Sequence, residues 1–349
     1  FLKLSALNDQ LSEWLNSKKG WRPHVINFSK SFVEEGLQDR AITRDLDWGV
    51  DIPNNELGDG KKIYVWFEAV IGYLSATKEW ASNMGDPELW KDFWLDENSE
   101  SYYFVGKDNV PFHAIIWPSM LMAYGDLNLP TNVPANQYIL IKGEKASASR
   151  GVGKTLNDYL DEWNPDSLRY ALGSILPEQN DSEISENEMI RRNNEELVAA
   201  WGNLVQRVFS QYINNFDNLD FDFELIDVDK NILDQANTCF EKTGQLIEKV
   251  ELKSALQTVM SFVNKINAYL NETEPWKVIK KDNKRGTAIL YSALTSIDAC
   301  ASMFTPFMPS TSQMVKNAIV RNTQNNWELN EIKKGAELKN IGHLFKKFD

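Results

Sequence analysis

Apolar and polar positions divide this chain of 349 residues into two parts of different character. Up to about residue 185, helical stripes alternate with short runs of β-branched and aromatic residues. After that point, apolar residues recur almost only at the spacing of a helix. The pattern therefore predicts an α/β region followed by an all-α bundle.

In the first part, strands and helices are expected to alternate. Helices are predicted through residues 1 to about 40, 73–80 and 112–122, where apolar positions follow a helical period. The runs typical of buried strands are residues 62–67, 102–106 and 137–141. This alternation favours a parallel α/β layer that binds its ligands at the strand ends.

In the second part, three segments carry long apolar stripes, at residues 197–212, 252–270 and 289–300. Short polar or proline-containing links separate these segments. The spacing predicts amphipathic helices that pack as an antiparallel bundle.

Composition adds few constraints. The content of 42% hydrophobic and 25% charged residues is ordinary for a globular chain, and no apolar run approaches the roughly 18 residues of a membrane span. The two cysteines, Cys239 and Cys300, are too few and too distant for a disulfide framework or a zinc knuckle, which favours a reducing, cytoplasmic setting. The net charge of −13 argues against indiscriminate nucleic-acid binding but permits a partner bound through a local basic face.

A basic loop at residues 142–155 stands out in this acidic chain because it holds four cations and one carboxylate. Small and hydroxyl residues between the cations allow backbone N–H and ammonium groups to approach a phosphate. The Gly-Lys-Thr triplet that starts at Gly153 resembles the end of a P-loop. A Walker A motif, however, needs glycine at position 148, where this chain has alanine, which disfavours a P-loop. A solvated basic turn is the other plain alternative.

Four collinear segments point to one family. They read TRDLDWG at 43–49, YVWFEAVIGY at 64–73, GKDNVPFH at 106–113 and KASASRG at 145–151. Together they resemble methionyl-tRNA synthetases, in the archaeal and eukaryotic form, over essentially the whole chain. The fourth segment resembles the KMSKS loop of class I aminoacyl-tRNA synthetases.

The resemblance implies an α/β fold, part of a Rossmann-type class I catalytic domain, followed by an all-α anticodon-binding helix bundle. Residues 1–144 would form the C-terminal half of the catalytic domain. Residues 145–184 would form the KMSKS-type loop and a stem-contact segment, and residues 185–349 the anticodon-binding domain.

Aromatic residues around two of the motifs suggest an amino-acid pocket. Trp66, Ala69 and Tyr73 are expected at the end of a strand and in the first turns after it, where they can line a narrow pocket for a polarizable thioether. The resemblance implies that methionine is bound by Trp66, Ala69, Tyr73, Asn109, Phe112, His113 and Ile116. Core packing is the plain alternative for each aromatic residue.

The implied chemistry is in-line attack of the methionine carboxylate on the α-phosphorus of ATP, which enters with Mg²⁺. Charge stabilisation and positioning dominate such a step. By resemblance, Arg44, Asp108 and Lys145 support adenylate formation. An internal salt bridge between Arg44 and Asp108 is the structural alternative.

The KMSKS-type loop departs from the family at two positions. Lys145, Ser147 and Ser149 match the ATP-binding loop, whereas Ala146 and Ala148 replace methionine and lysine. Loss of a cation from a phosphate clamp costs orders of magnitude in rate. Arg150 or Lys154 are candidates to compensate for it.

Two further family features are missing from this sequence, the HIGH motif and the zinc-bearing connective insertion. We therefore expect the isolated chain to be catalytically incomplete and to hold no metal site, with zinc confined to the absent insertion. The start at Phe1 rather than methionine favours a fragment or a processed product.

In the helical part, Asn203 and Arg207 are four residues apart and so share a helix face, away from the Leu204 and Val208 stripe. Trp276 follows a proline, where an exposed indole can stack on a base. The resemblance implies that Asn203, Arg207 and Trp276 read the CAU anticodon of tRNA(Met), chiefly its cytosine. An asparagine that relatives carry one turn earlier is Ala199 here.

The sequence thus predicts the C-terminal part of a cytoplasmic methionine–tRNA ligase with tRNA(Met), L-methionine and ATP as partners and no membrane association. A noncatalytic tRNA-binding module that retains the synthetase fold is the alternative. A synthetase for another large apolar amino acid is a weaker third interpretation, because the segments at 66–73 and 109–113 argue against it.

Overall fold

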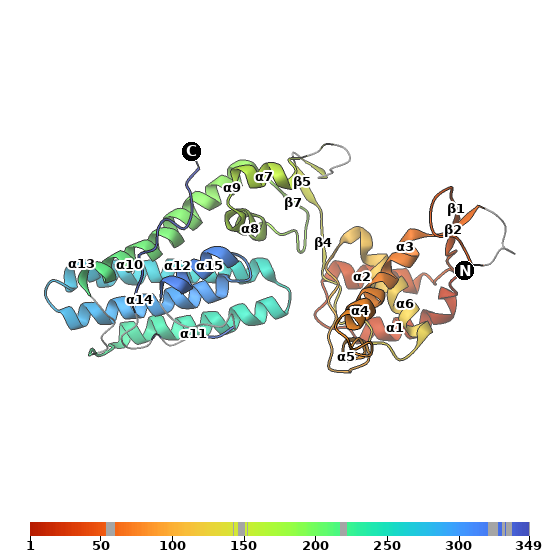
Figure 1. Ribbon diagram of the computed structural model, residues 1–349, viewed down its shortest axis with the longest axis horizontal. Coiled ribbons are helices and arrows are strands. Elements are labelled where there is room, and N and C mark those ends of the chain that lie inside the picture. Colours follow the sequence, from red (N-terminus) through yellow and green to blue (C-terminus); the bar gives the residue numbers. More distant parts are fainter. Residues whose placement is uncertain are drawn as a thin grey trace. The chain divides into compact units, whose positions relative to one another are not determined.

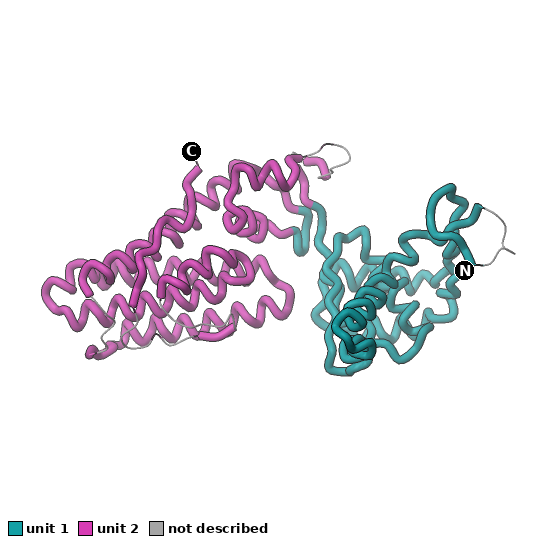
Figure 2. The backbone as a smooth tube through the Cα atoms, in the orientation of Figure 1, with its two compact units in different colours: residues 1–138, 177–181 teal, residues 139–176, 182–349 magenta. Residues whose placement is uncertain are grey.

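The chain folds into two compact units, shown in separate colours in Figure 2. Unit 1 comprises residues 1–138 and 177–181, and unit 2 comprises residues 139–176 and 182–349. The structure is a computed structural model. It describes residues 1–53, 60–141, 143–145, 151, 153–216, 222–319, 327–329, 332 and 337–348.

Unit 1 consists mainly of helices with two small strand pairs (Figure 1). Its helices are η1 (Leu4–Leu7), α1 (Asn8–Ser17), α2 (Pro23–Glu34), α3 (Val65–Glu68), η3 (Ala69–Ile71), α4 (Gly72–Asn83), α5 (Lys91–Trp94), η4 (Lys107–Asn109), the π-helix η5 (Phe112–Ile116) and α6 (Trp117–Tyr124). Its strands are β1 (Thr43–Asp45), β2 (Lys61–Ile63), β3 (Val105–Gly106) and β4 (Ala135–Asn136).

The predicted helices of unit 1 are confirmed, and their apolar faces form its core. Leu11 and Leu15 of α1 and Val25 of α2 are fully buried and belong to the same cluster as Ile115 and Leu121. Trp21 belongs to this cluster as well, and its indole donates to the carbonyl oxygen of Thr131 at 2.8 Å. The core thus places η5, the helix that carries His113, against α2.

The predicted strand at 62–67 is wrong beyond Ile63. β2 pairs antiparallel with β1, and the chain turns into α3 at Val65, where the amides of Phe67 and Glu68 donate to the Tyr64 carbonyl. An apolar run this short fits a strand and a helix equally well, so the local hydrogen bonds decide the outcome.

The other two predicted strands are shorter than expected. Within 102–106, only Val105–Gly106 forms a strand, paired parallel with β4, and the Phe104 side chain is 62% exposed. The run at 137–141 forms a strand only at Ile139–Ile141, in unit 2. In the described part of the chain, β2, β3 and β5 each pair with other strands and not with one another.

Unit 2 begins with a small three-stranded sheet and continues as a helical bundle (Figure 1). The strands are β5 (Ile139–Ile141), β6 (Glu144–Lys145) and β7 (Ser182–Glu183), in the order β6-β5-β7. The helices are α7 (Leu156–Glu162), α8 (Pro165–Ser174), α9 (Glu186–Arg192), the π-helix η7 (Asn193–Gly202), α10 (Asn203–Asn215), α11 (Asp227–Glu248), α12 (Leu252–Thr273), α13 (Pro275–Val278), α14 (Asn283–Phe304) and α15 (Pro309–Ala318).

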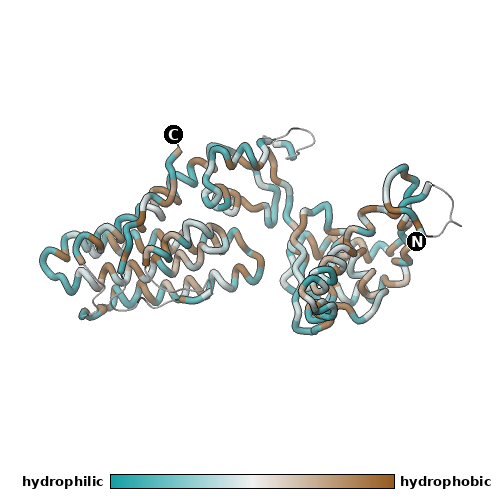
Figure 3. Tube along the Cα trace, in the orientation of Figure 1, coloured by the Kyte–Doolittle hydropathy of each residue, from teal (hydrophilic) through white to brown (hydrophobic). Residues whose placement is uncertain are grey.

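The bundle core is built from the three predicted apolar stripes, which confirms the helical prediction for this part. Leu204, Val263 and Leu294 come from α10, α12 and α14 and are all fully buried in one cluster. Figure 3 shows apolar and polar residues alternating along the bundle helices, as one-sided burial requires. The α11 stripe is sparser, with Ile232, Ala236 and Cys239 buried one turn apart.

Among the described helices, α14 alone is long and apolar enough to cross a membrane by composition. However, 89% of its most apolar window is buried inside the bundle. We therefore interpret α14 as the central core helix of unit 2.

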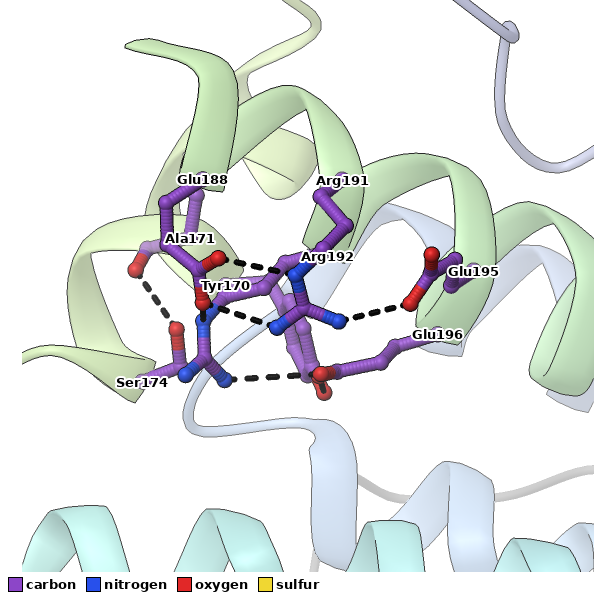
Figure 4. A network of polar contacts seen from close by, with 8 residues as sticks. All are labelled: Tyr170, Ala171, Ser174, Glu188, Arg191, Arg192, Glu195 and Glu196. Carbon is purple, nitrogen blue, oxygen red and sulfur yellow. Dashed lines mark hydrogen bonds and ion pairs between the residues drawn. The ribbon is translucent and has the colours of Figure 1, made fainter. Parts of the chain in front are cut away.

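An ion-pair network joins α8 to the long helical run α9–η7 (Figure 4). The Tyr170 hydroxyl of α8 donates to Glu196, which also pairs with Arg192. Hydrogen bonds from Arg191 lower the pKa of Glu188 to about 2. The network attaches the segment after the basic loop to the helix that leads into Asn203.

Candidate amino-acid and anticodon sites

Two aromatic residues of the predicted methionine pocket, Trp66 and Phe112, lie against each other. Trp66 is on α3 and Phe112 starts η5, and their rings stack with centroids 5.4 Å apart at 28°. Trp66 remains 50% exposed, so its indole is not closed off inside the core. This exposure favours a binding role over the core-packing alternative.

Tyr73 and His113 form the second pair, across 40 residues of sequence. The Tyr73 hydroxyl lies 2.7 Å from His113 Nε2, and Nδ1 lies 2.9 Å from the carbonyl oxygen of Asn109. Because a carbonyl only accepts, Nδ1 carries the proton, and Nε2 accepts from Tyr73. Burial lowers the pKa of His113, which favours this neutral form.

Two residues that the sequence analysis missed complete the aromatic cluster. Tyr103 lies edge-on to Tyr73 with ring centroids 5.0 Å apart, and the Trp117 indole donates to the Tyr103 hydroxyl at 3.0 Å. The helical spacing of His113 and Trp117 could have indicated Trp117, since residues four apart share a helix face. Tyr103 had no comparable signal outside its short apolar run.

The remaining predicted pocket residues flank these pairs along the chain. Ala69 begins η3, between Trp66 and Tyr73, and Ile116 ends η5 and is half-buried. Asn109 contributes its backbone carbonyl to His113. The structure thus joins the segments at 64–73 and 106–113 through two aromatic pairs, whereas it assigns no contact of this kind to Ala69 or Ile116.

The buried His113 leads to a prediction on pH dependence. Its pKa is lower in the folded than in the unfolded chain, so its contribution to stability is complete above about pH 6.5 and is lost as the pH falls through the folded value. We expect the free energy of unfolding to drop between pH 7.5 and pH 5.5, and to drop less in His113→Asn. Urea unfolding at both pH values measures this difference. Burial also lowers the pKa of His24, so His24 contributes to the drop in both proteins. An equal drop in the two proteins would therefore contradict the role assigned to the burial of His113.

Arg44 and Asp108 have separate partners. Arg44 donates to the carbonyl oxygens of Ala41 and Thr43 at 2.9 and 2.8 Å, and its guanidinium lies 4.2 Å from the centre of the Tyr64 ring. Asp108 accepts from the Tyr138 hydroxyl. The alternative of an Arg44–Asp108 salt bridge is therefore wrong for these two described residues.

Tyr138 and Lys107 were not predicted as part of this polar group. The Lys107 ammonium lies 3.8 Å from the centre of the Tyr138 ring and 2.9 Å from an Asp181 oxygen. Asp181 also accepts from the Tyr138 amide at 2.8 Å. These contacts hold in place Lys107, which precedes Asp108 in the sequence, and Tyr138, which donates to the Asp108 carboxylate.

The basic loop is only partly described. Lys145 is exposed on β6, opposite Leu140 of β5, while Ser147 and Ser149, like Ala146, Ala148 and Arg150, lie outside the described residues. The Lys154 ammonium lies 2.9 Å from Glu186 and 3.1 Å from Glu162, and these carboxylates raise its pKa to about 12. Lys154 is thus held by two carboxylates, which disfavours it as a replacement for the missing loop cation.

The residues predicted to read the anticodon lie on two helices of unit 2. Arg207 donates to Asn267 at 3.0 Å and to Asn271 at 3.4 Å, and its guanidinium lies 5.9 Å from the centre of the Trp276 ring. Asn203, the first residue of α10, is exposed one turn earlier. As predicted from the spacing, this face points away from the buried Leu204 and Val208.

Within the described ranges, no group of three or more histidine, cysteine, aspartate or glutamate side chains could hold a metal ion. The described polar groups at Asp108, Arg207 and Lys154 pair with protein partners instead.

The class to which this chain belongs, the class I aminoacyl-tRNA synthetases with an anticodon-binding domain, is shown by comparison with family models. Two family models match in this order, "tRNA synthetases class I (M)" over residues 1–209 and "Anticodon binding domain of methionyl tRNA ligase" over residues 224–349. The chain belongs to the methionyl-tRNA synthetase family, as the four sequence motifs predicted. The predicted fold class is confirmed as well.

Relatives and solved structures agree with this family. The methionine–tRNA ligases of Chloroflexus aggregans and Thermobifida fusca are each 44% identical to this chain, in alignments of 331 and 330 positions that cover 90% of this chain. These matches cover 55% and 54% of the two relatives, so the chain spans about half their length. A structure of Mycobacterium tuberculosis methionyl-tRNA synthetase in complex with methionyl-adenylate matches with a TM-score of 0.87 at 26% identity, over 98% of this chain and 67% of that one.

Proposed function

We propose that this chain carries the methionine-binding and anticodon-binding parts of a methionine–tRNA ligase, which uses ATP to activate L-methionine and transfers it to tRNA(Met). The observation that carries the proposal is that two sequence motifs meet through two aromatic pairs. Trp66 with Phe112 and Tyr73 with His113 bring residues 64–73 and 106–113 together, inside a family match over residues 1–209.

In this proposal, the methionine side chain lies against the Trp66–Phe112 stack. A flexible thioether makes favourable contacts with aromatic edges, worth about 0.3–1.5 kcal/mol each. The neutral His113 and its Tyr73 partner form the polar end of the site, and because both ring nitrogens are already engaged, that end rejects charged side chains. Ala69, Asn109 and Ile116 complete the pocket.

Activation would proceed by attack of the methionine carboxylate on the α-phosphorus of ATP, which enters as its Mg²⁺ complex. Asp108, kept in place by Tyr138, would accept hydrogen bonds from the ribose or from the ammonium group of methionine. Arg44, Lys145, Ser147 and Ser149 would contact phosphate or carboxylate oxygens. With alanine at 148 the loop supplies one signature lysine fewer, which slows activation, and we infer that the isolated chain is catalytically incomplete.

Recognition of tRNA would fall to unit 2. Trp276 would stack on the anticodon cytosine, and Arg207 and Asn203 would bind base edges. Arg207 suits this role because it is half-buried and two asparagines orient its guanidinium before the RNA binds. We also propose the division into residues 1–144, 145–184 and 185–349, and a cytoplasmic location, where tRNA is charged.

A titration with L-methionine tests the amino-acid site. We expect L-methionine to change the tryptophan fluorescence of the chain, and Trp66→Ala to weaken its binding about tenfold, since the thioether loses its aromatic wall. Trp80→Ala is the matched control, because Trp80 is also half-exposed on α4 and packs edge-on to Phe93. L-leucine should compete poorly. Equal losses of L-methionine affinity in the two variants, or binding of L-leucine as tight as that of L-methionine, would contradict the proposed methionine pocket.

A noncatalytic tRNA-binding module is the second candidate, favoured by Ala148 in the KMSKS-type loop. The same titration separates the two functions. A noncatalytic module would not bind methionine. It would therefore bind tRNA(Met), whereas its tryptophan fluorescence would stay unchanged at millimolar L-methionine.

A further inference from the structure

A cavity of about 590 Å³ lies along the seam between α11 and α12. Its floor is buried, with Cys239 of α11 and Phe262 of α12 only 8% and 3% exposed. Its walls are exposed polar side chains of both helices, namely Thr238 and Lys242 on α11 and Gln257, Ser261 and Lys265 on α12. Because each set recurs every three or four residues, the cavity is a groove that follows the two helices.

This groove is basic, although the chain as a whole has a net charge of −13. Lys242 and Lys265 are exposed, and neither takes part in an ion pair among the described residues. Glu251, in the link between the helices, is the single carboxylate among the described lining residues. The groove thus offers two ammonium groups that the described carboxylates do not pair with.

The two ammonium groups lie on either side of the Cys239 thiol. Burial raises the pKa of this thiol, and the charges of Lys265 and Lys242 oppose the rise, so both act on the same point of the floor. Since α11 and α12 run antiparallel around a link centred on Val250, Lys265 lies at the level of Gln235, which is equally far from Val250. Gln235 and Lys242 are seven residues apart, which separates the two cations by about 10 Å along the groove.

An extended acidic peptide fits this arrangement better than a helix or a small anion. The backbone of an extended chain needs hydrogen-bond partners, which Thr238, Gln257 and Ser261 can supply, whereas a helix satisfies its own backbone. Three residues of an extended chain span about 10 Å, and side chains three apart point to opposite sides. Two acidic side chains at this spacing would therefore reach Lys242 on one wall and Lys265 on the other.

The groove is on the side of α12 that faces away from the Arg207–Trp276 pair. Arg207 donates to Asn267 and Asn271 of α12. Lys265 precedes Asn267 by two residues, which turns its side chain about 200° around the helix. A partner in the groove would thus leave the proposed anticodon site accessible.

We propose that the α11–α12 groove binds an extended acidic segment of a partner protein, with Lys242 and Lys265 holding two acidic side chains three residues apart. Cys239 and Phe262 form the floor beneath the bound segment. Glu251 repels a further acidic residue at the link end of the groove. A local basic surface attracts such a partner despite the negative charge of the whole chain, because complementary charges across the contact determine which partner binds.

Anisotropy of the fluorescein-labelled peptide GSESSESG, in which two serines separate the glutamates, tests the proposal on the full chain. We expect saturable binding at fixed salt. Lys242→Gln and Lys265→Gln should each raise Kd about threefold, since each loses one partly exposed ion pair, and together about tenfold. Lys230→Gln, an exposed change on α11 outside the groove, is the control and should leave Kd unchanged.

Reversal of charge separates a specific groove from general attraction to cations. A variant with both Lys242→Glu and Lys265→Glu should bind the same peptide with lysines in place of glutamates, which the unmodified chain should not bind. The glutamate variant should also keep the tRNA(Met) affinity of the unmodified chain within about twofold, because the anticodon site lies on the other side of α12.

Three results would overturn the proposal. The first is that GSESSESG does not bind at millimolar concentration, and the second is that Lys230→Gln weakens its binding as much as the groove variants do. The third is that a CAU stem-loop RNA displaces the peptide, because the groove would then belong to the RNA-binding surface.

Discussion

Replacement of Trp276 by alanine is expected to weaken binding of a CAU-bearing tRNA to this chain by about 5- to 150-fold. Stacking of one base on an aromatic side chain contributes about 1–3 kcal/mol, which corresponds to this range. The guanidinium of Arg207 lies 5.9 Å from the Trp276 ring, so removal of the indole also takes away a surface against which Arg207 is oriented. Binding to tRNA(Met) and to a tRNA with another anticodon, measured by filter retention at fixed salt, checks the expectation.

The matched control for this variant is Trp327→Ala. Trp327 is also in unit 2, is 40% exposed and stacks on Phe240 with ring centroids 4.7 Å apart. It should leave tRNA(Met) binding within about twofold, because it lies outside the Arg207–Trp276 pair. If Trp276→Ala weakened both tRNAs equally, the indole would serve general RNA binding or packing between helices rather than anticodon recognition.

Replacement of Asp229 by alanine is expected to destabilise the helical bundle by about 3–5 kcal/mol, the usual cost of breaking a buried ion pair. Asp229 is fully buried and accepts hydrogen bonds from Arg285, from the Tyr269 hydroxyl at 2.5 Å and from the Ile226 amide at 3.0 Å. The alanine variant leaves the Arg285 guanidinium without a counterion and the first turn of α11 without its acceptor. Urea unfolding followed by far-UV circular dichroism at pH 7 measures the change.

Glu195→Ala is the control for this experiment. Glu195 pairs with Arg191 at 2.6 Å, but the Glu195 side chain is 62% exposed, and surface pairs of this kind contribute about 0–1 kcal/mol. A loss below about 1 kcal/mol in Asp229→Ala would mean that Arg285 and Tyr269 find other partners. The Asp229 cluster would then not be the polar centre of the bundle.

The helices of unit 2 could be predicted from the sequence because their signal is local and repeated. In α12, Leu256, Val259 and Val263 recur at the helical period over several turns, and all three are buried. A stripe of this length has no competing interpretation as a strand. The same reasoning found α4 and the helical run from Phe112 to Met122 in unit 1.

The short elements of unit 1 could not be predicted in the same way. The run at 62–67 contains only two residues of strand, Lys62 and Ile63, before the chain enters α3, and Phe104 in the expected second strand is exposed. Runs of five or six apolar residues carry too few periods to separate a helix from a strand. Pairing partners decide their structure, as Thr43 does for Ile63.

The sequence by itself determined the family of this chain and the helical nature of its second part. Both the order of the four motifs and the spacing of apolar residues can be identified without knowledge of tertiary contacts. Only the tertiary structure decided which candidate side chains meet. It pairs Tyr73 with His113, holds Lys154 between two carboxylates, and brings Asn203 and His343 to the lining of one cavity. These partners are separated by up to 140 residues, a distance over which no local spacing rule applies, so core packing and hydrogen bonding alone bring them together.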